Sequence, residues 1–357
     1  MGDLNFGKSF NIKEPGERPF KDMPQTIERS MQFYYPIPSK MCHSPFLDTL
    51  LWLKPRDLEA LLDFISPPAS KTYMKFFDES VTKRLALQKK QNELPEQERR
   101  QDIFYFLYNA IDPAISLTAY DAKILKAEAG LLVVAGSHTT SASLSGIFFY
   151  LTGDPRRLIK VQNKIRGVFE LTNDIIHGPK LASCTYLRAC VDEAMRLTSS
   201  GPSELPREVL RGGIHIQGQY YPAGTIVGTS SWCDARNQRV YGDPDVYRPE
   251  RWIVDEAEGV TKEHVARLKA NFNPFGAGPG HCVGKVFAMS EILIAVARTL
   301  HRLEVRRTPG STLGAGHPSL GWGARNPQQL HLKDAYITIR HGPEVQFRKR
   351  TTGSLGE

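Results

Sequence analysis

The segment Asn273–Gly284 places four glycines around a single cysteine, Cys282, within twelve residues. Because glycine has no Cβ, such a backbone can lie flat against a ligand and can adopt positive φ where a turn needs it. An amphipathic helical pattern begins directly afterwards. Cys282 is therefore expected at a helix N-terminus, where free N–H groups and the helix dipole favour a thiolate. The segment predicts either a thiolate presented from a glycine-lined loop or an ordinary glycine-rich turn with a buried cysteine.

A thiolate presented in this way suits the axial ligand of a haem iron. The segment resembles Phe-x-x-Gly-x-Arg-x-Cys-x-Gly, the haem-binding loop of the cytochromes P450, through Phe275, Gly278, Cys282 and Gly284. The resemblance implies that Cys282 is the iron ligand and that the other three residues belong to the cofactor-binding loop.

Three residues bear on how a haem propionate would be held. The family usually has arginine, whose side chain holds the propionate, where this chain has Gly280. His281, one residue later, either substitutes for that side chain or points away. Arg207 lies where many relatives have a propionate-binding arginine, and its alternative role is a salt bridge at the surface. Arg207 and His281 are therefore candidate cofactor-binding residues.

Residues Lys123–Leu151 predict one long helix whose middle has poor helix propensity. This middle segment reads Ala135-Gly136-Ser137-His138-Thr139-Thr140. Small residues admit a bulky neighbour, and a threonine hydroxyl can bond the carbonyl four residues back and open the helix locally. The alternative is a helix crossing that packs through small residues.

The same six residues resemble the oxygen-activation motif of the cytochromes P450, Ala/Gly-Gly-x-Asp/Glu-Thr-Thr. The resemblance implies that Thr139 orients dioxygen and the water that delivers its proton. The acid of the motif is replaced by His138. Since histidine titrates near neutral pH, we hypothesise that His138 is a modified proton relay.

The predicted helix Tyr186–Leu197 carries Glu193 and Arg196 three residues apart, on one helical face. Such a pair by itself usually lies at the surface. Here it is followed by Pro249-Glu250-Arg251-Trp252, and the two segments resemble the Glu-x-x-Arg helix and the Pro-x-Arg-Trp segment of the same family. The resemblance implies a buried ionic cluster of Glu193, Arg196 and Arg251 that positions the surroundings of the haem loop.

The other periodic segments predict a mainly helical chain with small sheets. The expected helices lie within residues 25–90, with breaks at Pro36–Pro38 and Pro67-Pro68, and at Pro155–Glu170 and Val286–Arg302; the expected strands are Ile214–Gln217, Thr225–Gly228, Tyr336–Ile339 and Val345–Phe347. We expect the last two to form a hairpin. Leu87 and Phe287 are expected on the apolar faces of their helices.

The composition, with 41% hydrophobic and 24% charged residues, is that of a globular protein. The net charge of +8 is spread along the chain, and its densest clusters, Arg302–Arg307 and Arg348–Arg350, are too short to indicate nucleic-acid binding. A basic face for an acidic protein partner is the simpler interpretation. Five cysteines without a Cys-x-x-Cys pair fit a reducing compartment better than a disulfide framework or a zinc site.

The N-terminal region has no signal-peptide pattern, and only Ala129–Tyr150 is long enough to cross a bilayer. Because that stretch carries a histidine and six hydroxyls, we interpret it as a buried helix of a soluble protein. Residues Asp3–Phe10 resemble a segment that lies well inside fungal cytochromes P450. The resemblance implies that the family's N-terminal part, including its membrane anchor, is missing.

Together the motifs identify the chain as resembling a fungal cytochrome P450 of the benzoate-hydroxylase-like type, over a single domain, residues 1–357, incomplete at its N-terminus. The resemblance implies a mostly α fold with small antiparallel β-sheets, and haem b held by a thiolate. It also implies insertion of one oxygen atom from O2 into a small organic or secondary-metabolite substrate. Electrons would come from NADPH-cytochrome P450 reductase. The location would be the endoplasmic reticulum membrane surface, or the cytoplasm if no anchor precedes the chain.

Two other functions stay open. A cysteine hydrolase or a metal site could use Cys282 with the adjacent His281, although no third orienting group is evident. Alternatively, the chain is a truncated, catalytically inactive remnant that binds haem or acts as a scaffold, a possibility that Gly280 and His138 favour.

Overall fold

The computed structural model describes residues 2–12, 14–16, 21–35, 49, 52–53, 59–114 and 116–350. The predicted break at Pro36–Pro38 and the cysteine Cys42 lie outside these residues. The chain divides into two compact units, Met1–His138 and Thr139–Glu357. The expectation of a single domain stays a prediction.

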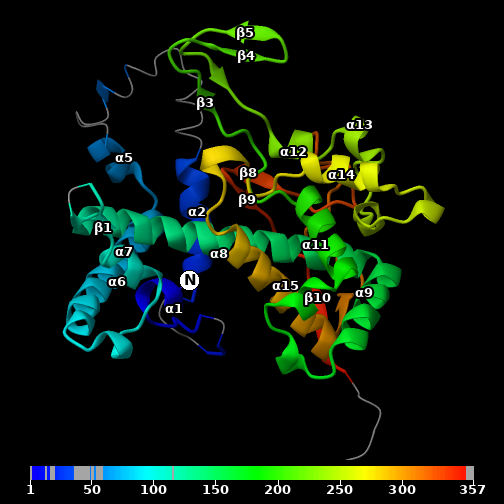
Figure 1. The fold of residues 1–357 in the computed structure, drawn as a ribbon, viewed down its shortest axis with the longest axis horizontal. Helices are drawn as coiled ribbons and strands as arrows, with labels where there is room; N and C mark the ends of the chain where they lie inside the picture. The colour runs from blue at the N-terminus through cyan, green and yellow to red at the C-terminus, as the bar shows by residue number, and fades with distance from the viewer. Residues whose placement is uncertain are drawn as a thin grey trace, which may run out of the picture. The chain divides into compact units, whose positions relative to one another are not determined.

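The described residues form helices and five two-stranded antiparallel sheets, which confirms the predicted fold class (Figure 1). The α-helices are α1 (Gly2–Phe6), α2 (Met23–Tyr34), α5 (Glu59–Ile65), α6 (Pro68–Asn92), α7 (Ile103–Tyr108), α8 (Ala122–Gly153), α9 (Pro155–Val168), α10 (Pro179–Ala182), α11 (Thr185–Leu197), α12 (Ser231–Asp234), α13 (Gln238–Tyr241), α14 (Lys262–Ala270) and α15 (Lys285–Arg302). Short 3-10 helices are η2 (Glu96–Glu98), η3 (Thr172–Asp174), η4 (Pro249–Trp252), η5 (Glu256–Glu258) and η6 (Gly278–Gly280).

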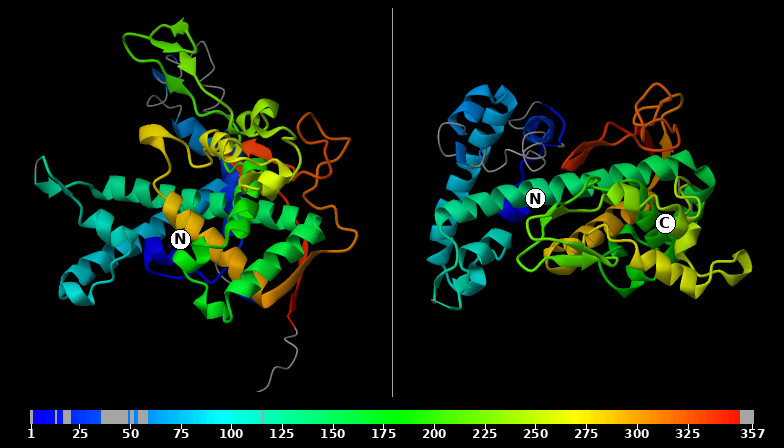
Figure 2. Two further views of the ribbon diagram at one scale, coloured as in Figure 1. Left: turned by 45° about the vertical axis from the view of Figure 1, so that its right-hand side comes forward. Right: turned by 90° about the horizontal axis from the view of Figure 1, so that it is seen from above.

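Each sheet is a single antiparallel pair of short strands. The pairs are β1 (Ile111–Asp112) with β2 (Leu117–Thr118), β3 (Arg207–Glu208) with β6 (Ile226–Val227), β4 (Ile214–Ile216) with β5 (Gln219–Tyr221), β7 (Leu303–Arg307) with β10 (Val345–Lys349), and β8 (Lys333–Ala335) with β9 (Ile337–Ile339). Two strands predicted from the sequence, β4 and β6, are confirmed, but they belong to different sheets. The β4–β5 hairpin projects away from the helices of the second unit (Figures 1 and 2).

In the first unit, α6 begins at the predicted Pro67-Pro68 break and buries Phe76 and Phe77 as its pattern indicates. The predicted burial of Leu87 is wrong, because its side chain is 40% exposed. The same turns of α6 bury Arg84 instead, whose Nη2 donates to Asp102 Oδ1 at 2.7 Å. In these turns the buried face of α6 therefore includes an arginine paired with a carboxylate, and Leu87 lies on the exposed face.

Helix α8 confirms the long helix predicted for Lys123–Leu151. It stays α-helical through its small-residue middle, so the expected local opening does not occur. Hydroxyls along it bond carbonyls of the preceding turn, as from Ser145 Oγ to Ser141 O at 2.9 Å. Such bonds satisfy polar side chains inside a helix without breaking it.

Among the described residues, α8 is the one helix long and apolar enough to cross a membrane by length and composition. In its most apolar window, 39% is buried inside the protein. A core helix has the same composition, so our interpretation of α8 as a buried helix of a soluble protein stays a prediction.

The core of the second unit is built by the residues of α8 from Thr139 onward together with α9, α11 and α15. Ile147, Val191 and Val296 from three of these helices are fully buried in it. The helices predicted by periodicity at Pro155–Glu170, Tyr186–Leu197 and Val286–Arg302 are thus confirmed, with ends that differ by one or two residues.

The predicted C-terminal hairpin is wrong. Both strands exist, but β9 pairs with β8 across Tyr336, which has a φ of +69°, and β10 pairs with β7 over five residues. The backbone at Gly342 runs against Leu313, whose oxygen would lie 2.6 Å from an added Cβ. Between β9 and β10 the chain therefore runs alongside the backbone at Leu313, and these two strands do not form a hairpin with each other.

The two basic clusters seen in the sequence come together on the β7–β10 pair. Its register places Arg306 opposite Gln346 and Glu304 opposite Arg348. Arg306 Nε donates to Gln346 Oε1 at 3.0 Å, and both side chains are at or near the surface. A basic face for an acidic partner stays a prediction.

Candidate active site

The cysteine loop connects α14 to α15. Gly276 and Gly278 both have a φ of +71°, a conformation that side chains with a Cβ rarely adopt. Cys282 N donates to Phe275 O at 2.8 Å, and the ring of Phe275 packs against the core of the second unit. The loop is thus closed on itself and fixed to the core at Phe275.

The thiol of Cys282 is exposed at the start of α15, an 18-residue helix whose N-cap is Gly284. A Cβ at Gly284 would lie 3.8 Å from Cys282 Sγ, so the sulfur lies over the N-cap. The alternative of a buried cysteine in an ordinary turn is therefore wrong.

Three apolar residues that follow Cys282 in the sequence are exposed. Val283, Val286 and Phe287 are 95%, 72% and 49% exposed. The predicted burial of Phe287 is wrong, because it lies in the first turn of α15, before the buried face that starts at Met289. The chain therefore exposes apolar side chains at the start of α15, close in sequence to a potential metal ligand.

Arg207 and Gly280 lie side by side. A Cβ added at Gly280 would be 3.6 Å from Arg207 Nη2, an ordinary contact distance. Arg207 Nη1 donates to Leu205 O at 3.3 Å and to Pro206 O at 3.0 Å, and no carboxylate of the described residues forms an ion pair with it. The surface salt bridge considered for Arg207 is therefore not formed within the described part of the chain.

His281 is turned onto its own loop. Its Nδ1 lies 2.9 Å from Gly278 O, within hydrogen-bonding distance, so Nδ1 is the protonated nitrogen if the bond forms. Of the two possibilities left open by the sequence, the structure favours the one in which His281 points away from a ligand of the loop.

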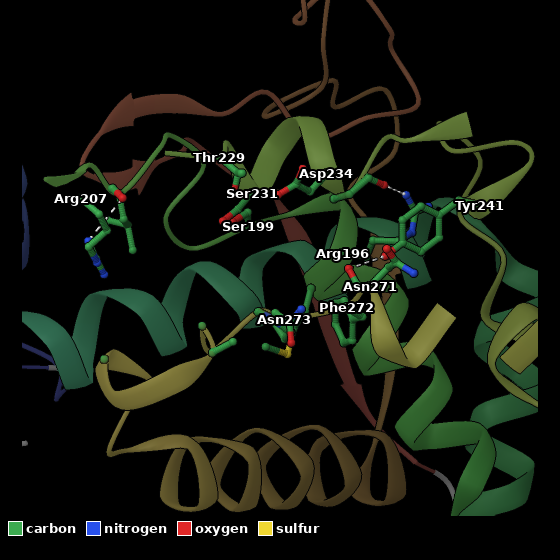
Figure 3. A pocket seen from close by; sticks show the side chains of 17 residues that line it. Arg196, Ser199, Arg207, Thr229, Ser231, Asp234, Tyr241, Asn271, Phe272 and Asn273 are labelled. Atoms are coloured by element: carbon green, nitrogen blue, oxygen red, sulfur yellow. Dashed lines mark hydrogen bonds between the residues drawn. The ribbon is translucent and has the colours of Figure 1, made fainter. Parts of the chain in front are cut away.

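A cavity of about 280 Å3, lined by both polar and apolar side chains, lies along the flank of the loop (Figure 3). Arg207 lies at one end of it, and Tyr241 and Asn271 lie at the other. Its lining residues are Met195, Arg196, Ser199, Leu205, Arg207, Thr229, Ser231, Asp234, Ala235, Tyr241, Asn271, Phe272, Asn273, Pro274, Gly276, Ala277 and Gly280. Cys282 is not among them, so the cavity adjoins the Arg207–Gly280 side of the loop.

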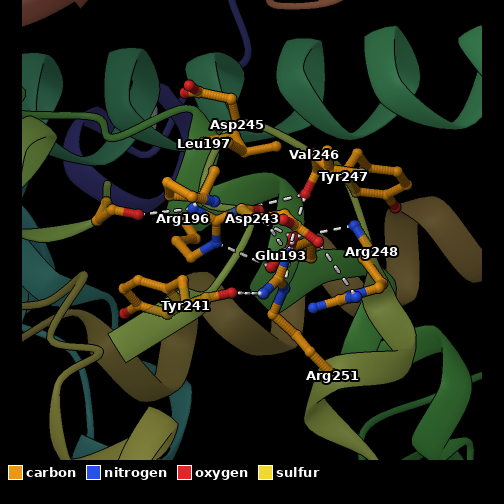
Figure 4. A network of polar contacts seen from close by, with 12 residues as sticks. Glu193, Arg196, Leu197, Tyr241, Asp243, Asp245, Val246, Tyr247, Arg248 and Arg251 are labelled. Carbon is orange, nitrogen blue, oxygen red and sulfur yellow. Dashed lines mark hydrogen bonds and ion pairs between the residues drawn. The ribbon is translucent and has the colours of Figure 1, made fainter. Parts of the chain in front are cut away.

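The structure brings Glu193, Arg196 and Arg251 together in a fully buried cluster (Figure 4). Arg196 binds the carboxylate through two nitrogens, Nε at 2.9 Å and Nη2 at 2.8 Å. Arg251 Nε donates to Glu193 Oε1 at 3.0 Å. Bidentate geometry of this kind is the strongest form of an arginine–carboxylate contact.

Further groups saturate this cluster. Trp252 Nε1 donates to Glu193 Oε2 at 2.9 Å, and the backbone N–H of Arg248 donates to Oε1 at 3.0 Å. Arg196 Nη1 donates to two backbone carbonyls, Ala235 O at 2.6 Å and Pro244 O at 2.7 Å. One carboxylate therefore ties α11 to η4 and, through Arg196, to the segment between α12 and η4. Trp252, next to Arg251 in the sequence, is a participant that sequence reasoning missed.

Burial alone raises the pKa of Glu193, but the hydrogen bond from Arg196 and the charges of Arg196 and Arg251 outweigh it, so the net pKa lies below the usual range. Burial also lowers the pKa of Arg251, and the charge of Glu193 opposes that effect. Glu193 is thus ionised and compensates two buried cations.

Thr139 is the half-buried first residue of the second unit, and its carbonyl accepts a hydrogen bond from Ser200 Oγ at 3.1 Å. Its helix shares a core with α15, which follows the cysteine loop. His138 is buried and is the last residue of the first unit.

The arrangement does not favour a cysteine hydrolase or a metal site of protein ligands alone. His281 bonds a carbonyl of its own loop. The described residues contain no group of three histidine, cysteine, aspartate or glutamate side chains that could hold a metal ion. A single soft thiolate at a helix N-terminus instead suits an iron whose other ligands come from a cofactor.

The sequence profile of the cytochrome P450 family matches residues 2–318. The chain belongs to the cytochrome P450 family. Among curated relatives, the cytochrome P450 monooxygenase fscF of Fusarium equiseti is 32% identical over 98% of this chain and 64% of its own length. The cytochrome P450 monooxygenase apf7 of Gibberella fujikuroi is 35% identical over 80% of this chain and 53% of its own length. The chain thus spans between half and two thirds of these two relatives.

The fold comparison agrees with this assignment. A crystal structure of a cytochrome P450, CYP102L1, superimposes with a TM-score of 0.69, covering 98% of this chain and 69% of that one. The sequences are 19% identical, so this likeness establishes the cytochrome P450 fold alone.

A cytochrome P450 monooxygenase of Purpureocillium lilacinum, lcsN, is 32% identical over 84% of this chain and 84% of its own length.

Proposed function

We propose that the chain is a haem-thiolate monooxygenase that inserts one oxygen atom from O2 into a small organic substrate, as the names of its fungal relatives indicate for them. The observation that carries this proposal is the exposed thiol of Cys282, held over the N-terminus of α15 by a loop closed between Phe275 and Cys282. Within the part of the chain described, no other cysteine combines exposure with the start of a long helix.

The residues around the thiol fit a haem. The exposed apolar side chains Val283 and Phe287 offer a surface that a flat macrocycle would remove from water. Arg207, beside Gly280, offers a guanidinium to a carboxylate on the edge of that macrocycle. A soft sulfur, an apolar surface and a cationic guanidinium are thus available to an iron, a porphyrin face and a propionate, respectively.

When bound, the haem supplies an iron that activates dioxygen with electron donation from the thiolate. Cys282 would hold the iron, Arg207 a propionate, and the glycines of the loop would let the backbone approach the macrocycle. Thr139 would orient dioxygen and a proton-delivering water, and His138 would act as a proton relay near neutral pH. Glu193, Arg196 and Arg251 would keep the loop's surroundings in position.

Electron supply and location belong to the same proposal. A reductase that uses NADPH, at the endoplasmic reticulum membrane surface, is the donor by family resemblance. The positive charge of the chain, +8, is compatible with an acidic partner surface. Secondary-metabolite precursors are the substrate class that we propose.

The experiment that tests the proposal is a carbon monoxide difference spectrum of the reduced, haem-loaded chain. A thiolate-type Soret shift is expected. Absence of that shift would contradict the proposal and would favour the inactive remnant that binds haem or acts as a scaffold.

Replacing Arg207 with alanine is expected to weaken haem binding about tenfold, the effect of losing one hydrogen bond to a charged group. The double variant R207A/G280R should regain most of the affinity, because a side chain at Gly280 meets only Arg207 Nη2 and its φ is outside the left-handed region. Titration of the haem-free chain measures both. The exposed Arg211→Ala is the matched control; unchanged affinity in R207A would contradict the assignment.

A further inference from the structure

One face of helix α8 lies against the segment that follows α11, residues 198–200. On this face are the carbonyl of Thr139 and the small residues Ser143 and Gly146. Thr139, Ser143 and Gly146 are spaced by four and three residues, so they lie on one helical face. At Gly146, an added Cβ would lie 2.4 Å from Thr198 Oγ1, so only glycine fits there. The segment 198–200 therefore lies directly against this face of α8.

Three oxygen atoms meet where this segment passes Thr139. Ser200 Oγ lies 3.1 Å from Thr139 O, Ser143 Oγ lies 3.2 Å from the same carbonyl, and the two hydroxyl oxygens are 3.2 Å apart. Ser143 is buried and Ser200 is half-buried. Ser143 belongs to the same helix as this carbonyl. Of the two hydroxyl groups, the one of Ser200 therefore comes from outside α8.

Ser200 is held from its other side by strand β9. Thr338 N donates to Ser200 O at 3.0 Å, and Thr338 Oγ1 donates to the carbonyl of Ser199. Thr338 is fully buried. Ser200 is thus fixed between α8 and β9, just after the helix that carries Glu193 and Arg196.

We infer that Ser200 is a positioning residue for Thr139, and this inference rests on the proposed function. A carbonyl that accepts an extra hydroxyl shares its lone pairs with the helical N–H four residues on, which weakens that bond and lets the carbonyl tilt out of the ladder. Ser200 therefore sets the orientation of the peptide unit at Thr139, and with it the direction of the threonine hydroxyl. Ser200 acts here as a neutral hydrogen-bond donor to the backbone.

The contact is tested first in the haem-free chain, by hydrogen exchange of the Ser143 amide, whose helical acceptor is Thr139 O. In Ser200→Ala the carbonyl loses one of its two competing hydroxyl donors and keeps that of Ser143, so the Ser143 amide is expected to exchange roughly fivefold more slowly, the factor for one hydrogen bond. Ser200→Thr, which keeps the hydroxyl, should restore the wild-type rate. Unchanged exchange in S200A would overturn the inference, whether or not haem binds.

The consequence is tested in the haem-loaded chain by the stretching frequency of carbon monoxide bound to reduced iron, which reports the polar groups that face the ligand. S200A should shift the frequency, S200T should restore it, and Ser183→Ala, whose exposed hydroxyl donates to Lys180 O at 2.8 Å, should leave it unchanged. A thiolate-type spectrum with the same frequency in S200A and wild type would overturn the inference alone. A wild-type chain without that spectrum would contradict the proposed function. The exchange measurement would then still test whether Ser200 bonds the carbonyl of Thr139.

Discussion

Replacing Glu193 with glutamine is expected to destabilise the second unit by about 3–5 kcal/mol, the usual cost of breaking a buried ion pair from one side. Glutamine keeps the shape of the side chain but leaves the guanidiniums of Arg196 and Arg251 buried without a counter-charge. Both cations are 1% exposed, so water cannot take the place of the carboxylate. Urea unfolding, with the midpoint compared at constant slope, measures the loss.

The exposed Glu170→Gln is the matched control, since a surface substitution is expected to change the free energy of unfolding by less than about 0.5 kcal/mol. If E193Q were as stable as this control, the cluster would not be holding the second unit together. Loss of cooperative unfolding in E193Q would agree with the account, because α11 and η4 would then separate.

The pH dependence of the same variant gives an independent check. The pKa of Glu193 is lowered in the folded chain, so its contribution to stability is fully present above the ordinary glutamate value of about 4.3. That contribution is lost as the pH falls through the lowered folded value. The stability difference between wild type and E193Q should therefore narrow below about pH 4. A difference that stays constant down to acid unfolding would contradict the assigned charge state.

Replacing Cys282 with serine is expected to leave the fold intact and to remove the thiolate-type spectrum. The side chain is exposed, so the free energy of unfolding should change by less than about 0.5 kcal/mol. A serine hydroxyl is a poor iron ligand, and haem affinity should fall by more than about a hundredfold, beyond the loss typical of an outer-shell partner. Haem titration and the carbon monoxide difference spectrum measure the two effects.

Cys233→Ser is the matched control, because Cys233 is the other exposed cysteine among the residues described. It should bind haem with the wild-type spectrum. If C282S kept the thiolate-type band, or if C233S lost it, Cys282 would not be the ligand.

Helices could be predicted from the sequence wherever one face stays buried over several turns. Helices α9 and α11 follow from apolar periodicity, and Glu193 and Arg196 are neighbours by helical spacing alone. Local spacing, however, does not indicate which distant strand completes a pair. β9 was therefore predicted to pair with β10, although β8, across the single residue Tyr336, is its partner.

In the candidate site too, local features could be predicted from the sequence, and contacts between distant residues could not. The spacing of the loop predicted a cysteine at a helix start, because glycines and a following helix are local features, but it left open whether that cysteine is exposed or buried. The side-chain directions of His281 and Arg207 could not be predicted, since they depend on the carbonyl of Gly278 and on the space left at Gly280. Ser200 has no sequence signal, because its role comes from a contact with Thr139, 61 positions away.

X-ray absorption at the iron edge of the haem-loaded chain tests the central claim most directly. One sulfur atom among the nearest neighbours of the iron is expected, and it should disappear in C282S but remain in C233S. An iron surrounded only by nitrogen and oxygen atoms, or a folded chain that takes up no haem iron at all, would contradict the account.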